Sequence, residues 1–113
     1  HVKGVTHRDV KLENIIIDRK GIIKLIDFAS AAQPPLISYS KYFVGHPPTW
    51  PLKLWAGKDH GPPTDIWASG VLLYAMMCGA FPFSGQTDKD LYKKIRESTS
   101  LVWPDKTTAS KEA

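Results

Sequence analysis

The stretch His7-Arg8-Asp9-Val10-Lys11-Leu12-Glu13-Asn14, followed further along by Asp27-Phe28, decides how this 113-residue sequence is interpreted. It sets two carboxylates, an ammonium group and an amide at fixed spacings. A lone Asp, Lys or Asn in a loop is usually a turn former or a solvated charge. Five fixed residues at about 5% usage each match roughly once in a few million starting positions, so chance explains the set poorly.

The residues after this stretch predict a β-hairpin. Residues 14–17 and 21–26 are short runs rich in β-branched side chains, and the polar turn Asp18-Arg19-Lys20-Gly21 separates them. Two such runs joined by a short turn that contains glycine are typical of a hairpin. The hairpin would bring Asn14 and Asp27 to the same end, one before its first strand and one after its second.

Two helices are predicted in the second half, after an irregular stretch. Residues 29–63 are rich in proline and glycine, which in a compact domain usually marks a functional loop. Residues 64–78 predict a helix with Thr64 as N-cap; its body is apolar on nearly every side, so we expect burial all round. Residues 87–97 predict an amphipathic helix with an inner side made of Leu91, Tyr92 and Ile95.

At the opening stretch the chain resembles the eukaryotic protein kinase family. The likeness continues in Asp65-Ile66-Trp67 with Gly70, similar to the start of the family's central helix, and in Gly79-Ala80-Phe81-Pro82-Phe83, similar to the turn that ends it. The resemblance implies a mainly helical α+β fold, with a small β-hairpin beside the catalytic loop and a buried central helix. Residues 1–113 would form a partial catalytic domain, a fragment of the C-terminal lobe. The small N-terminal lobe and the last C-terminal helices would be absent.

The resemblance also implies roles for the residues of the site. Asp9 would be the catalytic carboxylate that accepts or orients the proton of the substrate hydroxyl. Lys11, which is similar to the lysine of serine/threonine-specific kinases, would neutralise charge on the transferring phosphate. Asn14 and Asp27 would bind Mg²⁺ through oxygen atoms, and Ile16 would form part of the adenine-pocket floor. The implied cofactors are therefore ATP and Mg²⁺.

Further residues have supporting roles by resemblance, each with a plainer alternative. His7 would pack in the core against Phe28. Asp65 would anchor the catalytic loop by accepting backbone N–H bonds, although a simple acid at a helix terminus is the alternative. Leu72 and Met76 would support the adenine pocket, or would be ordinary core residues. Candidate phosphorylation sites in the presumed activation loop are Ser38, Tyr39, Ser40 and Tyr42.

Three departures from the family pattern keep a second function open. Ala29 follows Asp27-Phe28 where the family has glycine, and alanine reaches some glycine conformations only at about 1 kcal/mol. His46 stands in place of a threonine, and Lys53 in place of the glutamate of an Ala-Pro-Glu signature. The intact site residues favour a serine/threonine kinase that acts on protein hydroxyls. The departures favour a pseudokinase or scaffold lobe that binds partners without catalysis.

The second half is most similar to the group of calcium/calmodulin-dependent and AMP-activated kinases. The residues that carry this likeness are Gly61-Pro62-Pro63-Thr64-Asp65-Ile66-Trp67 and Phe83-Ser84-Gly85-Gln86, with Leu91-Tyr92-Lys93-Lys94-Ile95. Because no phosphate-covering lobe is present, we expect the isolated chain to be inactive. We also expect the absent lobe, or a partner, to cover its apolar surface.

Composition limits the remaining choices. Hydrophobic residues make up 42% and charged residues 23%, which is ordinary for a soluble globular protein, and no apolar stretch has transmembrane length. The single Cys78 lies in an apolar run, so no disulfide framework or zinc spacing is present, and an intracellular, cytoplasmic setting is expected. The net charge is +4, but the basic cluster at Lys89, Lys93, Lys94 and Arg96 is interspersed with acidic residues on a predicted helix. A solvated helix face explains it better than nucleic-acid binding.

Overall fold

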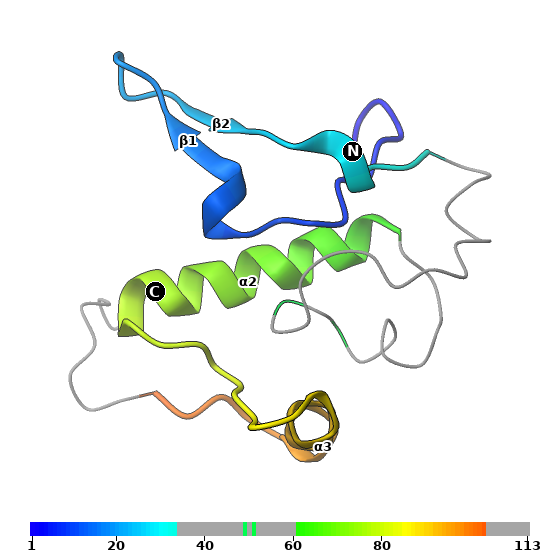
Figure 1. Cartoon of the computed structure of the whole chain (residues 1–113), viewed down its shortest axis with the longest axis vertical. Helices are drawn as coiled ribbons and strands as arrows, with labels where there is room; N and C mark the ends of the chain where they lie inside the picture. The colour runs from blue at the N-terminus through cyan, green and yellow to red at the C-terminus, as the bar shows by residue number, and fades with distance from the viewer. Residues whose placement is uncertain (34–48, 50, 52–60, 104–113) are drawn as a thin grey trace.

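The computed structural model describes residues 1–33, 49, 51 and 61–103. Within these residues, α2 runs through the middle, with the hairpin on one side and α3 on the other (Figure 1). A small antiparallel sheet and two α-helices agree with the predicted α+β class. In chain order the elements are η1 (Leu12–Asn14), β1 (Ile15–Ile17), β2 (Ile23–Leu25), η2 (Phe28–Ser30), α2 (Pro62–Cys78) and α3 (Asp88–Glu97).

The predicted hairpin is confirmed, with strands shorter than the sequence indicated. β1 and β2 pair antiparallel, with Ile16 opposite Lys24 at the centre of the register. The turn takes up the remaining residues, because the backbone N–H of Asp18 donates to the carbonyl of Ile22 at 2.9 Å. Gly21 has a φ of 77°, a left-handed conformation that glycine adopts without the cost of a Cβ.

α2 begins two residues earlier than predicted. Its N-cap is Gly61, and Pro62 and Pro63 open the helix, where a missing backbone N–H loses no hydrogen bond. The prediction that Thr64 is the N-cap is therefore wrong: Thr64 lies inside the first turn and its N–H donates to the Gly61 carbonyl at 2.9 Å. The helix ends at Gly79, whose φ of 70° gives a left-handed C-cap.

α2 is buried only in part within the described part of the chain. Val10 from the N-terminal loop packs with Ala68 and Leu72 of the helix, and Ile15 of β1 joins them. Ile66 is 65% exposed and Met76 is 61% exposed. Val71 and Tyr74 are buried as well, but the expectation of burial all round is wrong, because the described residues leave part of the apolar helix uncovered. No helix among these residues combines the length and the apolar character that a bilayer-crossing segment needs.

α3 confirms the predicted amphipathic helix. The hydroxyl of Thr87 caps it, accepting from the N–H of Asp90 at 3.2 Å and donating to its carboxylate at 2.8 Å. Leu91 and Ile95 are buried, whereas Tyr92 is half-buried. The chain then returns to α2, where the Tyr74 hydroxyl donates to the Val102 carbonyl and the Tyr74 ring lies 5.0 Å from that of Trp103.

Candidate functional site

Three of the residues predicted to act together form one cluster, in which Asp9 and Asn14 are buried and Lys11 is half-buried. The Lys11 Nζ lies 3.0 Å from Asp9 Oδ2. The Asn14 amide nitrogen donates to the Asp9 carbonyl at 2.8 Å and to Asp9 Oδ2 at 3.1 Å. Asp9 and Asn14 are buried, and η1 holds the short connection between them. The spacing in the sequence therefore brings an ammonium group and an amide to a single carboxylate.

Lys11 is charged beside Asp9, and one oxygen of the Asp9 carboxylate has no hydrogen-bond donor among the described residues. The hydrogen bond to Asp9 is the main cause that raises the pKa of Lys11, and the charges of Glu13 and Asp27 add to it. Lys11 therefore stays an ammonium at neutral pH. Asp9 Oδ1 is buried and has no hydrogen-bond partner among the described residues. A buried acceptor without a donor is costly, and it is available to a hydroxyl group that enters the site.

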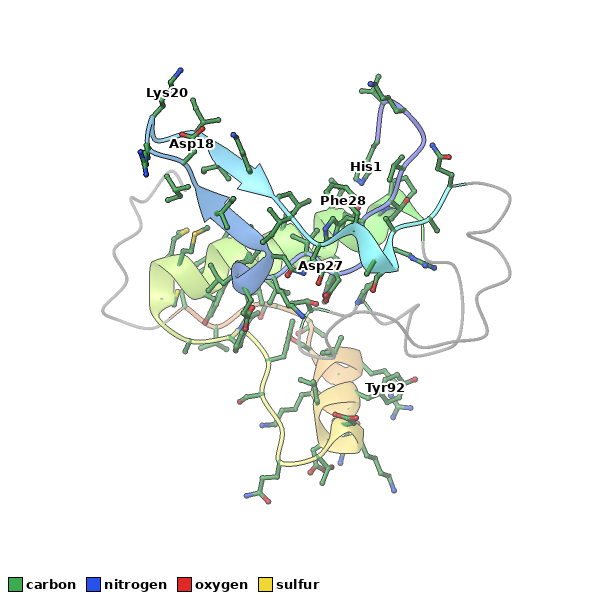
Figure 2. The ribbon with its side chains drawn as sticks, turned by 45° about the horizontal axis from the view of Figure 1, so that its top comes forward. His1, Asp18, Lys20, Asp27, Phe28 and Tyr92 are labelled. Atoms are coloured by element: carbon green, nitrogen blue, oxygen red, sulfur yellow. The ribbon has the colours of Figure 1, made fainter. Side chains whose placement is uncertain are left out.

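Asp27 lies at the base of the hairpin, at the same end as Asn14. The backbone N–H of Ile26 donates to the Asn14 carbonyl at 2.8 Å, which closes this end of the ladder. Figure 2 shows Asp27 at the base, far from Asp18 at the tip. Asp27 has a left-handed φ of 62°, and its Oδ1 accepts from the N–H of Ala29 at 3.2 Å. The hairpin therefore carries both predicted metal ligands at one mouth.

The ligand set suits a magnesium ion that is shared with a phosphate. The hydrogens of the Asn14 amide are engaged by Asp9, so its oxygen is the atom left to bind a cation. Asp27 is exposed and adds a carboxylate. Mg²⁺ typically takes one or two carboxylates and completes its shell with water and substrate phosphates. No three His, Cys, Asp or Glu side chains within residues 1–33, 49, 51 and 61–103 could hold a metal by themselves.

The predicted adenine-pocket residues are only partly brought together. Ile15 of β1 packs on the core, so the alternation of a strand turns Ile16, which is 43% exposed, to the other face. Leu72 is buried in the core, in line with the plainer alternative. Met76 does not join it among the described residues, because its side chain is largely exposed. The role of Ile16 in binding adenine stays a prediction.

Asp65 anchors the loop that carries Asp9, as predicted. Its Oδ2 accepts the backbone N–H of His7 and its Oδ1 that of Arg8, both at 2.8 Å. The carboxylate thus reaches across 57 residues to hold two successive amides. Arg8 has a φ of 69°, which is uncommon for a residue with a Cβ. Burial lowers the pKa of Arg8, and the charge of Asp65 opposes that effect.

His7 is a buried packing residue, as predicted, and it links the two halves of the site. Its ring meets that of Phe28 edge-on, with centroids 4.7 Å apart. Its Nδ1 accepts the N–H of Asp9 at 3.2 Å, and its Nε2 lies 3.0 Å from the Ile26 carbonyl. A neutral ring with its proton on Nε2 satisfies both bonds. The imidazole therefore joins Asp9 to the residue that precedes Asp27.

The expected cost of Ala29 does not arise in this structure. The left-handed conformation falls on Asp27, not on Ala29, which lies within η2. The sequence motif placed the strain two residues too late, because a motif does not say which of its residues takes the positive φ. His46, Lys53 and the candidate phosphorylation sites at residues 38–42 lie outside the described residues.

One contact of Asp65 was not predicted. The Nε2 of His1 lies 2.8 Å from Asp65 Oδ2, the oxygen that also accepts from His7. No pattern in the sequence signals a pair that is 64 residues apart. The anchor therefore has a third hydrogen-bond partner at the start of the chain.

A family model described as protein kinase domain matches residues 1–113. This chain belongs to the protein kinase family. It is 38% identical over 96 residues to a serine/threonine-protein kinase SIK3 homolog of Danio rerio, covering 84% of this chain and 8% of that protein. It is 46% identical over 92 residues to serine/threonine-protein kinase pim-2 of Danio rerio, covering 78% of this chain and 29% of that protein.

A third relative is NUAK family SNF1-like kinase 2 of Rattus norvegicus, 41% identical over 96 residues, with 84% of this chain and 15% of that protein covered. The chain thus spans less than a third of the length of each of these relatives. The buried Asp9 cluster belongs to the matched region.

Proposed function

We propose that this chain is part of the C-terminal lobe of a serine/threonine kinase that transfers the γ-phosphoryl group of ATP to protein hydroxyls. The observation that carries the proposal is the Asp9, Lys11 and Asn14 cluster, with Asp27 at the mouth of the adjoining hairpin. Membership of the protein kinase family supports it. So do the names of two of the relatives above, which are called serine/threonine-protein kinases.

The residues divide the reaction between them. Asp9 Oδ1, which lacks a donor, accepts the hydroxyl proton as the new O–P bond forms and the bond from the γ-phosphorus to ADP breaks. Lys11 neutralises charge on the phosphoryl oxygens. Asn14 and Asp27 hold Mg²⁺, which supplies further charge neutralisation on the phosphates. Ile16 contacts the adenine, and η1 keeps the catalytic carboxylate close to the metal ligands.

The test is phosphorylation of a protein substrate by the full-length protein in ATP and Mg²⁺. We expect activity that Asp9→Asn lowers by at least about 100-fold, since the variant removes the proton acceptor. Asp27→Asn should lower activity and raise the Mg²⁺ concentration that the remaining activity needs, because a carboxylate ligand is lost. Asp88→Asn is a matched control, because Asp88 is an exposed carboxylate in the first turn of α3. Full activity in Asp9→Asn would contradict the proposal.

The second candidate is a pseudokinase or scaffold that binds partners without catalysis. His46 and Lys53, where the family has threonine and glutamate, favour it, whereas the unstrained Ala29 removes one argument for it. Thermal stabilisation by nucleotide separates the two. A rise in the melting temperature with ATP that requires Mg²⁺ favours the enzyme. No rise with ATP, whether or not Mg²⁺ is present, favours the scaffold.

The partners and the location in the cell belong to the same proposal. ATP and a protein substrate are the expected partners, with no nucleic acid, because the basic side chains of α3 are interspersed with acidic ones. A further part of the full-length protein, or a partner, would cover the exposed apolar surface. An intracellular, cytoplasmic protein is expected, and fractionation of cells that produce the tagged full-length protein would test it.

A further inference from the structure

The segment after β2 is a short helical turn that the side chain of Asp27 caps. Asp27 is the N-cap of η2, and its Oδ1 accepts the backbone N–H of Ala29 at 3.2 Å. The turn closes where the N–H of Ala31 donates to the carbonyl of Phe28 at 3.0 Å. A predicted metal ligand is therefore held by the turn that follows it.

The Asp27 carboxylate is carried by a backbone in an uncommon conformation. Asp27 has a φ of 62° and a ψ of 76°, which is left-handed. A residue with a Cβ stays in this conformation only where its surroundings impose it, and the bond from the Ala29 N–H is one such contact. This bond uses Oδ1, so Oδ2 is the oxygen left to bind a cation. The order of η2 thus bears on the placement of a metal ligand before the metal binds.

Ala29 makes this turn more ordered than a glycine would. It stands where the family has glycine, and it lies within η2. Among the described residues other than glycine, only Arg8 and Asp27 have a positive φ, so Ala29 is in a conformation that alanine adopts without strain. At such a position alanine has less conformational freedom to lose than glycine has. The side chain of Ala29 is exposed, so its Cβ acts through the backbone and not through packing.

We propose that Ala29 is a positioning residue: it favours the η2 turn, and its backbone N–H then holds the Asp27 carboxylate in place to bind Mg²⁺. Ala29 touches no reacting atom. The effect on the use of Mg²⁺ rests on the proposed kinase function, whereas the order of the turn rests on the backbone contacts alone. Asp9 lies on the loop before the hairpin, so the KM for the protein substrate should not change.

Three substitutions in the full-length protein separate positioning from a general loss of stability. Ala29→Gly returns conformational freedom to the turn, so we expect the Mg²⁺ concentration for half-maximal kcat to rise about two- to fivefold. Ala29→Ser keeps a Cβ and should fall closer to the original protein than to Ala29→Gly. Ala80→Gly is the matched control, because Ala80 is an exposed alanine beyond the end of α2, and it should leave the Mg²⁺ requirement unchanged.

Hydrogen exchange at the Ala31 amide, without nucleotide or Mg²⁺, gives a readout that needs no activity. This amide closes the turn, and its intrinsic exchange rate depends on residues 30 and 31, so a substitution at residue 29 leaves that rate unaltered. Exchange should quicken about two- to fivefold in Ala29→Gly, because the turn opens more often. It should stay at the original rate in Ala80→Gly.

Unchanged exchange together with an unchanged Mg²⁺ requirement in Ala29→Gly would overturn the proposal. So would faster exchange without a change in the Mg²⁺ requirement, since the order of the turn would then have no bearing on Asp27. A lower Mg²⁺ requirement in Ala29→Gly would show that alanine hinders the site. If the unmodified protein transfers no phosphate, the proposed function fails, and the exchange rate at Ala31 alone decides whether Ala29 orders the turn.

Discussion

At the scale of single residues, Asp65 is the most demanding position of the chain. Both of its oxygens accept backbone N–H bonds, and an amide in its place could accept at only one. We expect Asp65→Asn to destabilise the protein by about 1–3 kcal/mol, because one buried N–H would face an NH₂ group. Chemical denaturation of the full-length protein measures this, with Asp88→Asn as the exposed control. A loss of unfolding free energy as small as that of Asp88→Asn would show that the loop keeps its conformation without the Asp65 carboxylate.

Asp18 gives a pH dependence whose sign follows from its hydrogen bonds. Its Oδ1 accepts the N–H of Ile22 at 2.9 Å and that of Lys20 at 2.8 Å, and its Oδ2 pairs with Lys24 at 3.3 Å. These contacts lower the pKa of Asp18 below its ordinary value near 3.8, and the hydrogen bond from Ile22 has the largest effect. The unfolded chain therefore binds a proton more readily in acid, and the stabilisation present at neutral pH is lost as the pH falls through the folded pKa.

The matching experiment follows amide exchange or NMR shifts of the hairpin turn between pH 7 and pH 2. Order in the turn should decline in the unmodified protein as the pH falls through the lowered pKa of Asp18, where its carboxylate takes up a proton. Asp18→Asn keeps a side-chain acceptor for the turn but cannot titrate, so its turn should show no such transition. A transition that persists unchanged in Asp18→Asn must come from another group.

The site residues show which contacts a sequence can predict. Asp9, Lys11 and Asn14 lie within six positions, so local backbone geometry brings them together and the spacing is informative. The contact from His1 to Asp65 joins positions 64 apart and depends on how the loop crosses α2. Patterns read along the chain contain no such information, which is why that contact was missed.

At the scale of elements, Gly85 controls how the loop after α2 meets α3. A Cβ at this position would lie 2.5 Å from the Leu91 nitrogen and 3.0 Å from the Thr87 carbonyl oxygen, both backbone atoms that cannot turn aside. We expect Gly85→Ala to destabilise α3 by about 1–3 kcal/mol, since the first turn must shift. Thermal or chemical unfolding of the full-length protein measures it.

Gly70 is the matched control for this substitution. It lies within α2, and a Cβ there meets no atom within 4 Å. Gly70→Ala should therefore be neutral or stabilise by up to about 1 kcal/mol, because alanine is the better helix former. Equal effects of the two substitutions would mean that the crowding at Gly85 is relieved without cost.

The limits of the elements were predicted less well than their existence. The hairpin and both helices were predicted from runs of β-branched residues, turn residues and apolar content. The start of α2 was misplaced because Thr64 is a good N-cap by type, whereas Pro62 and Pro63 already have the backbone angle of a first turn. The sequence thus contained two signals for the start of the helix, and the helix begins at the prolines because their φ is already fixed at a helical value.

At the scale of the whole molecule, the two sides of α2 differ in a way that residue patterns predicted only in part. One side meets Val10 and the hairpin, and the site is built there. Elsewhere on the helix, Ile66 and Met76 are exposed, and so are Ile17 and Ile23 on the hairpin. Apolar content along the helix indicated that it should be covered. The apolar content could not indicate that the described residues leave Ile66 and Met76 uncovered.

The exposed apolar side chains lead to a prediction for residues 1–113 produced alone. Large exposed apolar patches drive association, so we expect the isolated chain to self-associate with rising concentration in sedimentation velocity. Ile66→Lys with Met76→Lys should lower association several-fold without breaking α2, because lysine is a good helix former. Val2→Lys, at an exposed residue outside the helices and strands, should change it little. A monodisperse monomer with a sharp cooperative melt would show instead that the partial cover of α2 suffices for an independent fold.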